Sequence, residues 1–230
     1  MKKSVLSFVI ISTISVFALK AQDCVCYSPT NVGAKLEITN YDAQGVVTGS
    51  SLQTLIKKEI TGNETRITFS SQRIKTNPEK DSVSTYDYYC KAGVFYVDMN
   101  KIVEPFKANL NNSMELTFSA IDLQIPGNLK VGDELPKSSV IITITSGKLP
   151  IMKYSISMVN RKVAAIETIT TSAGSFECYK ITYDNKSSMK FEVLHKCADW
   201  FAVNVGIIKS ETYDEKGVLL NYFLLTKFSN

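Results

Sequence analysis

The single histidine is the first residue to consider for chemistry, because many hydrolytic mechanisms need a general base. His195 falls in an alternating segment on the same side as Phe191 and Val193, where an imidazole more often hydrogen-bonds within the fold. A Ser-His-Asp or Cys-His scheme would have to use this residue, and the sequence contains no G-x-S-x-G, H-E-x-x-H or P-loop signature. We therefore interpret His195 as structural and expect no catalytic residues. A hydrolase built from two distant carboxylates is the remaining enzymatic hypothesis.

Disulfide formation is the next candidate chemistry. The five cysteines are Cys24, Cys26, Cys90, Cys178 and Cys197. If the segments around Cys178 and Cys197 form a hairpin that turns at Ser187–Ser188, these two cysteines face each other, which predicts a cross-strand disulfide. Cys90 then pairs with Cys26 or with its neighbour Cys24, and this bond ties the N-terminal segment to the sheet.

Other roles for the cysteines are free buried thiols or a metal or redox motif at Cys24-Val-Cys26. Redox pairs usually have two intervening residues, and one histidine cannot complete a metal site that these cysteines begin. We therefore expect no metal and no cofactor.

Two similar stretches carry aspartates that could act as paired carboxylates: YDAQGVVTG at Tyr41–Gly49 and YDEKGVLL at Tyr213–Leu220. In each, an aspartate is followed three positions later by a glycine, between two alternating segments. Asp at the first position of a turn accepts backbone N–H groups, and Gly supplies the positive φ that closes a hairpin. The spacing therefore predicts structural turns, with Asp42 and Gly45 in the first and Asp214 and Gly217 in the second.

Alternation of apolar and polar residues dominates the sequence. In MKYSISMVN, for example, Met152, Tyr154 and Ile156 fall on one side and Lys153 and Ser155 on the other. A period of two over this length predicts strands with one buried face, and the short connections favour antiparallel pairing.

One segment departs from this alternation. Ile102, Val103, Phe106 and Leu110 recur at roughly helical spacing, and Pro105 suits a first helical turn. The pattern predicts one short helix over Glu104–Asn111. The turn-rich stretch Pro126–Ser138 is interpreted as a crossover within a single domain.

Clustered aromatic residues are the best candidates for a binding surface. They lie in STYDYYCKAGVFYVDMN and in ADWFAVNVG, where adjacent aromatics point to opposite faces of a strand. One interpretation is ordinary packing of a core on one side and of the helix on the other. The other is a curved sheet whose concave face lines an apolar groove with the helix at its mouth. The candidate binding residues are Tyr88, Phe95, Tyr96, Phe106, Trp200 and Phe201.

The N-terminal residues resemble a secretory signal peptide. Lys2 and Lys3 precede an apolar segment over Val5–Leu19, and small residues follow at Ala18 and Ala21. Asp23 before Cys24 disfavours lipoprotein processing, so we expect residues 1–21 to be removed and residues 22–230 to be a non-lipidated periplasmic or secreted domain.

The chain has 26 basic and 22 acidic residues, and removal of the three lysines of residues 1–21 leaves 23 basic residues, a net charge of +1. No basic run is interleaved with aromatics, and no polybasic run adjoins an apolar segment. These features disfavour nucleic-acid binding and polybasic attraction to a membrane.

Several stretches share the pattern of one family of exported proteins. They are YDAQGVVTG at Tyr41–Gly49, CKAGVFYVDM at Cys90–Met99, VGDELP at Val131–Pro136, NRKV at Asn160–Val163, TSAGSFECYKITY at Thr171–Tyr183 and WFAVNVGIIKSETYDEKG at Trp200–Gly217. The chain thereby resembles the TapB-like family of Bacteroidota, from which Cys197 departs. The resemblance implies a single antiparallel sheet curled into an open half-barrel, similar to envelope lipoprotein carriers, and a tetratricopeptide-repeat protein as partner. A β-sandwich is the alternative fold.

The expected function is therefore binding and not catalysis. A curved sheet would engage an envelope partner protein or an apolar ligand. A lipid or lipoprotein carrier is the first alternative and a hydrolase with an unrecognised site is the second.

Overall fold

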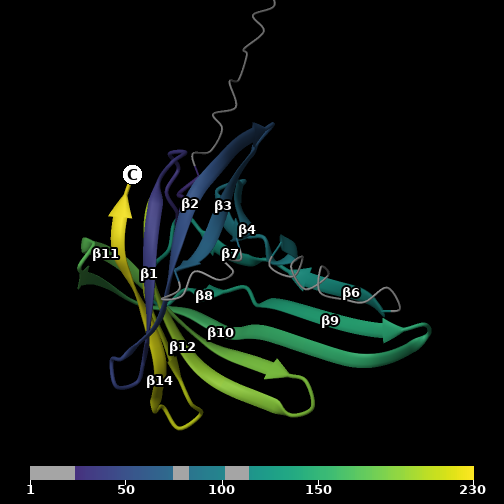
Figure 1. The fold of residues 1–230 in the computed structure, drawn as a ribbon. Helices are drawn as coiled ribbons and strands as arrows, with labels where there is room; N and C mark the ends of the chain where they lie inside the picture. The colour runs from purple at the N-terminus through teal and green to yellow at the C-terminus, as the bar shows by residue number, and fades with distance from the viewer. Residues whose placement is uncertain (1–23, 75–82, 102–113) are drawn as a thin grey trace, which may run out of the picture.

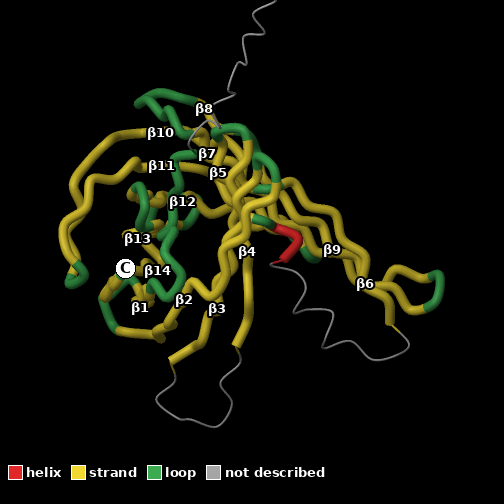
Figure 2. Tube along the Cα trace, turned by 90° about the horizontal axis from the view of Figure 1, so that it is seen from above, coloured by secondary structure: helices red, strands yellow, loops and turns green. Residues whose placement is uncertain are grey.

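The structure is a computed structural model that describes residues 24–74, 83–101 and 114–230 (Figure 1). The expected signal peptide, residues 1–21, lies outside the described residues. So does the expected helix Glu104–Asn111, with the candidate binding residue Phe106. Within the described residues, helical backbone is confined to residues 99–101 (Figure 2).

One continuous antiparallel sheet accounts for nearly all of the described chain. Its strands are β1 (Lys35–Asp42), β2 (Val47–Thr61), β3 (Glu64–Ile74), β4 (Val83–Lys91), β5 (Val94–Val97), β6 (Met114–Ile121), β7 (Leu123–Pro126), β8 (Glu134–Leu135), β9 (Ser138–Ser146), β10 (Leu149–Thr171), β11 (Gly174–Ser188), β12 (Glu192–Ala202), β13 (Gly206–Tyr213) and β14 (Leu219–Ser229). The order across the sheet is β6-β9-β10-β11-β12-β13-β14-β1-β2-β3-β4-β5-β7, and β8 also pairs with β10. The expected single-sheet, mainly β fold is confirmed, and the alternative of two packed sheets does not form.

The sheet curls into a nearly closed barrel with one seam, between its edge strands β6 and β7 (Figure 2). These strands are consecutive in the chain, which crosses the seam at Asp122, and the Asp122 carboxylate accepts the Tyr89 hydroxyl at 2.6 Å. Arg161 of β10 joins the two sides of the seam. Its Nη1 donates to the carbonyl oxygens of Gln124 at 3.0 Å and Pro136 at 2.7 Å, and the residue is 2% exposed. The expected crossover at residues 126–138 contains β8 and leads from β7 to β9.

Residues 24–30, at the start of the described chain, pack against the core, whereas residues 31–33 are exposed. Tyr27 is 1% exposed and contacts Phe95, Tyr179 and Phe201 edge-on, with ring centroids 6.0, 6.0 and 6.2 Å away. Its hydroxyl donates to the Pro126 carbonyl at 3.4 Å. Such edge-to-face contacts stabilise aromatic pairs beyond simple burial. The segment therefore belongs to the core and is no loose leader to the first strand.

The predicted Cys178–Cys197 disulfide is wrong. The register of β11 and β12 places Tyr183, and not Cys178, opposite Cys197, and both cysteines are free and buried. The serines Ser187–Ser188, expected to form the turn, instead extend β11, and the chain turns at residues 189–191. The physical reason is that a turn signal of two serines is weak, and both serines find partners on β10 and β12.

A disulfide joins Cys24 to Cys90, with their Cα atoms 6.0 Å apart. This bond ties the N-terminal segment to β4, so the expected link exists with Cys24, and not Cys26, as the partner. The Cys26 Sγ lies 3.7 Å from the Cys90 Sγ, and burial raises the pKa of the Cys26 thiol.

The two Tyr-Asp-x-x-Gly stretches form hairpin turns of the same kind. In each, the aspartate Oδ1 accepts the N–H of the residue four positions later, at 2.9 Å for Asp42 and 2.8 Å for Asp214. Gly45 and Gly217 have φ values of 82° and 85°, which a residue with a Cβ adopts only with strain. Because β1 pairs with β14, the two hairpins lie side by side (Figure 1). Both carboxylates are engaged with backbone groups, as their spacing predicts.

Candidate functional site

The face of β2, β3 and β4 that lies inside the barrel changes from apolar to polar along the strands. Residues two apart in a strand share a face, and the register aligns them in rows. The successive rows are Leu55, Phe69 and Tyr86, then Gln53, Ser71 and Ser84, then Ser51 and Arg73. The neighbouring strand β1 follows the same trend, from Leu36 and Ile38, which are buried, to Asn40, which is exposed. The inside therefore has an apolar part and a polar part at one end.

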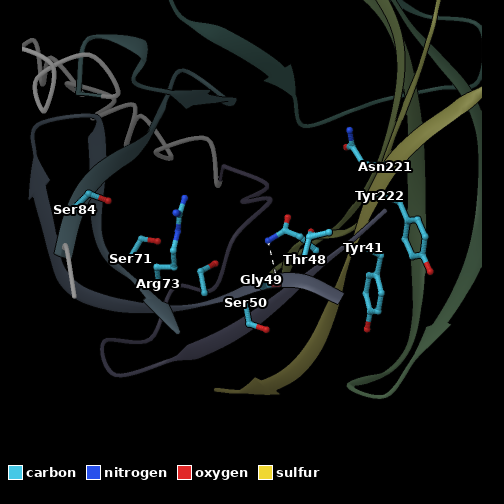
Figure 3. A pocket seen from close by; sticks show the side chains of 11 residues that line it. Tyr41, Thr48, Gly49, Ser50, Ser71, Arg73, Ser84, Asn221 and Tyr222 are labelled. Atoms are coloured by element: carbon cyan, nitrogen blue, oxygen red, sulfur yellow. Dashed lines mark hydrogen bonds between the residues drawn. The ribbon is translucent and has the colours of Figure 1, made fainter. Parts of the chain in front are cut away.

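A polar cavity of about 660 Å³ lies at this end (Figure 3). Hydroxyl, amide and tyrosine side chains dominate its lining, and Arg73 is the one charged residue among the described residues that form it. Figure 3 shows the Arg73 side chain between Ser71 and Ser84 on one side and Thr48 and Asn221 on the other. A guanidinium with five N–H donors among hydroxyl groups suits an oxyanion such as a carboxylate or phosphate.

A second cavity, of about 250 Å³, adjoins the first and shares Asn40 and Ser51 with it. Its apolar lining includes Leu36, Ile38, Phe69, Tyr86, Tyr88, Ile207 and Phe223. The volume of the first cavity is that of a small-molecule site, and the second adds an apolar extension to it.

The tyrosines of the second cavity are held neutral. Burial raises the pKa of Tyr88 to about 12 and that of Tyr86 well above its usual value. The Tyr86 hydroxyl donates to Gln53 Oε1 at 2.8 Å. Neither cavity is lined by a carboxylate, histidine or cysteine among the described residues. The two cavities thus offer an apolar surface, neutral hydrogen-bonding groups and one cation.

The predicted binding residues do not form one site. Tyr88 lines the second cavity. Phe95 and Phe201 are 1% and 4% exposed and pack in the core around Tyr27, whereas Tyr96 stacks on the ring of Tyr89 with centroids 4.6 Å apart.

Trp200 is buried between two lysines. The Nζ atoms of Lys180 and Lys209 lie 4.7 and 4.6 Å from the centre of its ring, and its Nε1 donates to Glu167 Oε1 at 2.6 Å. These cation–π contacts and this hydrogen bond engage the ring and the polar edge of the indole. Trp200 is therefore engaged within the protein.

Sequence reasoning missed the polar lining residues. Asn40, Ser51, Ser71, Arg73 and Ser84 are separately ordinary strand residues, and no motif marks them. The available signal was a change in the residues that share one face of a strand. Every second residue is Leu, Ile and then Asn in LEITN, and Ile, Phe and then Ser and Arg in ITFSSQRI. Recognising it needed the register that aligns these positions across strands.

Two other clusters of polar groups stand apart from these cavities. The Cys24, Cys26 and Cys90 sulfurs lie within 4.8 Å of one another, but the disulfide leaves Cys26 as the one thiol, whereas structural zinc sites use four ligands. The second cluster consists of Asp199, Tyr183 and Arg161. The Asp199 carboxylate accepts a hydrogen bond from the Tyr183 hydroxyl at 3.0 Å, and the positive charge of Arg161 acts on the same carboxylate.

Burial acts in opposite directions on the two charged groups of that second cluster. It raises the pKa of Asp199, and it lowers the pKa of Arg161 to about 10. Both effects disfavour the charged form of a buried group.

Among the described residues, no helix has the length and apolar character needed to cross a membrane.

Comparison with curated proteins finds no match. Two solved structures share the fold. One is a presumed exported protein with a YmcC-like fold from Bacteroides fragilis, with a TM-score of 0.70 and 20% identity, and the match covers 90% of this chain and 100% of that one. The other is a presumed lipoprotein from Parabacteroides distasonis, with a TM-score of 0.72, 22% identity and the same coverage.

The profile of one protein family matches residues 31–225. This range spans the sheet from just before β1 into β14. The narrower TapB-like resemblance stays a prediction. The chain belongs to the DUF3108-like family.

Proposed function

We propose that this protein is a non-catalytic exported binding protein whose barrel takes an amphipathic ligand with an anionic or strongly polar head. The apolar part of the ligand lies against Phe69, Tyr86 and Phe223 in the smaller cavity, and the head lies beside Arg73 in the larger one. The observation that carries this proposal is the pair of adjoining cavities, apolar in one part and polar with a single cation in the other.

The energetics favour such a ligand. Each methylene removed from water contributes about 0.8 kcal/mol, so a chain that buries six contributes about 5 kcal/mol. A hydrogen bond from the Arg73 guanidinium to an oxyanion adds about 1.5 kcal/mol, the low end of the range for charged groups, because Arg73 is exposed and solvent screens its charge. An uncharged apolar ligand would leave the hydroxyl-lined cavity filled with water, so it would gain the free energy of apolar burial but not that of the hydrogen bond to Arg73.

Export without a lipid anchor is part of the proposal. The signal-like residues 1–21 support export, and the names of the two solved relatives agree with it. The Cys24 sulfur is engaged in a disulfide, which supports a mature chain that is not lipidated there. A tetratricopeptide-repeat partner, implied by the TapB-like resemblance, remains the alternative occupant of the concave face.

Native mass spectrometry of the protein purified from its own cell envelope tests the proposal first. A bound species of lipid mass is the expected result. A bound polypeptide would favour the interaction-module alternative, and substrate turnover would favour the hydrolase.

Displacement of a fluorescent fatty acid then measures affinity in the delipidated protein. We expect Arg73→Gln to weaken binding of dodecanoate about tenfold, which corresponds to about 1.4 kcal/mol, while binding of the uncharged methyl ester changes little. Lys162→Gln, which removes an exposed cation on β10 away from both cavities, is the matched control and should bind like the wild type. Absence of saturable binding, or equal weakening for acid and ester, would refute the assignment.

A further inference from the structure

Two neighbouring hairpins project from the same side of the molecule (Figure 1). They are the β9–β10 hairpin, which turns at residues 147–148, and the β11–β12 hairpin, which turns at residues 189–191. The register joins them, because Ser155 of β10 pairs with Ser188 of β11. This pair is next to the β11–β12 turn but seven residues from the β9–β10 turn, so the β9–β10 hairpin extends roughly 20 Å further. The β11–β12 tip therefore lies against the side of the longer hairpin, and the two make one elongated surface, the hairpin-tip surface, although about 40 residues of sequence separate their turns.

This hairpin-tip surface is apolar and exposed. Its large apolar side chains, with their exposed fractions, are Leu149 at 72%, Ile151 at 51%, Met189 at 57%, Phe191 at 81% and Val193 at 45%. Single exposed apolar residues are normal on a soluble protein, but a contiguous group marks an interaction site. Phe191 is the most exposed of the large apolar residues in the described chain.

The same tips carry an excess of positive charge. Lys148 and Lys153 lie on the first hairpin and Lys186 and Lys190 on the second, whereas Glu192 is the one carboxylate of residues 146–154 and 186–193. Lys186 and Glu192 form a loose ion pair at 4.0 Å, which contributes little at this exposure. These lysines form no continuous basic run in the sequence and are brought together only when the hairpins pair.

We propose that the hairpin tips dock the protein on an anionic lipid surface. Apolar and aromatic side chains that enter the headgroup region, with lysines beside them, are the composition of interfacial membrane binders. A nearby anionic surface attracts each of the lysines. The centre of a protein–protein interface, in contrast, is depleted in lysine, so the charge pattern favours lipid over a protein partner. This docking does not depend on the proposed ligand cavity, although a membrane surface is where an amphipathic ligand would be collected or delivered.

Co-sedimentation of the mature protein with vesicles tests the proposal. Vesicles of phosphatidylcholine with one quarter phosphatidylglycerol should bind the protein at least tenfold more tightly than vesicles of phosphatidylcholine alone. Raising sodium chloride from 0.1 to 0.5 M should reduce this preference, because salt screens exposed charges.

Two double variants separate the apolar and the electrostatic contributions. Leu149→Ser with Phe191→Ser should reduce binding to both kinds of vesicle, while Lys148→Gln with Lys190→Gln should remove the preference for the anionic kind. Val46→Ser with Val218→Ser changes exposed valines at the other hairpin end, at 61% and 59% exposure, and should bind as the wild type does. Circular dichroism verifies that each variant is folded.

Several results would overturn the proposal. Equal binding of the wild type to both kinds of vesicle is one, and unchanged binding by both tip variants is another. An equal loss of vesicle binding in the Val46→Ser and Val218→Ser control would show that the hairpin tips are not the surface that contacts the vesicle. Protection of Phe191 by a co-purifying protein, measured by hydrogen exchange, would assign the surface to a protein partner instead.

Discussion

Replacing Arg161 by methionine should open the seam of the barrel. The side chain is 2% exposed and donates to the Gln124 and Pro136 carbonyls from opposite sides of the seam. Methionine has a similar length and fills much of the space, but it donates nothing. The variant therefore leaves both carbonyls without the guanidinium and removes the positive charge of Arg161 that acts on Asp199.

The size of the effect follows from these contacts. Two hydrogen bonds from a charged donor contribute about 1.5–3 kcal/mol each. The buried guanidinium also carries a desolvation cost, which the variant no longer has. We expect a net loss of about 3 kcal/mol in the free energy of unfolding, which lowers Tm by about 6–12 °C in a protein of this size.

Urea and thermal unfolding measure this loss, followed by circular dichroism and by the fluorescence of Trp200. Trp200 is the one tryptophan of the chain and is buried, so its emission reports exposure of the core. Arg73→Met is the matched control, because Arg73 is exposed, and its effect should remain within about 0.5 kcal/mol. Arg161→Lys should lie between the two, since an ammonium reaches the carbonyls less well than a fork of donors. An Arg161→Met protein as stable as the control would refute the idea that this residue holds the seam.

Two further predictions concern the cysteines and the buried carboxyl. In Cys24→Ser, Cys26 should replace Cys24 as the disulfide partner of Cys90, because the Cys26 Sγ already lies 3.7 Å from the Cys90 Sγ. Thiol titration of the denatured variant should then find two free thiols, against three in the wild type. Four free thiols would contradict the prediction. For Asp199, burial raises the folded-state pKa above its ordinary value, so the carboxyl's contribution to stability is present at low pH and is lost as pH rises through the folded-state pKa. As the pH rises from 4 to 7, the free energy of unfolding of the wild type should therefore fall relative to that of Asp199→Asn, as measured by urea denaturation. A difference between the two proteins that does not change with pH would show that Asp199 titrates as it does in the unfolded chain.

The strands and the two matching turns were accessible from sequence because their signals are local. Alternation in segments such as MKYSISMVN depends on neighbouring residues alone, and Asp42 and Gly45 determine their turn within four positions. The same locality explains the failure at Cys178 and Cys197. Their pairing depends on the register of two strands, and moving the turn from Ser187–Ser188 to residues 189–191 changes every pair.

The cavity lining was beyond a sequence-based prediction for a related reason. Ser51 and Arg73 meet through pairing of β2 with β3, and Asn40 joins them from β1. Aromatic content pointed to Trp200 and Phe201, but aromatic residues are enriched in cores as well as in binding sites. Arg161 gave no signal at all, because its partners are two backbone carbonyls that any residue could supply.

The pairing of β1 with β14 has a consequence for how the polypeptide reaches its final form. Glu37 on the first strand bonds Lys227 on the last, 190 positions away. A nascent chain cannot complete this contact until almost the whole polypeptide has been made, and contacts of such long range are slow to form. Until then β1 has a row of unpaired amide and carbonyl groups along one side, which is the kind of edge that recruits strands from other molecules. The protein is thus expected to depend on holding factors during its biogenesis, and removal of residues 219–229 should yield aggregates in place of a smaller folded protein.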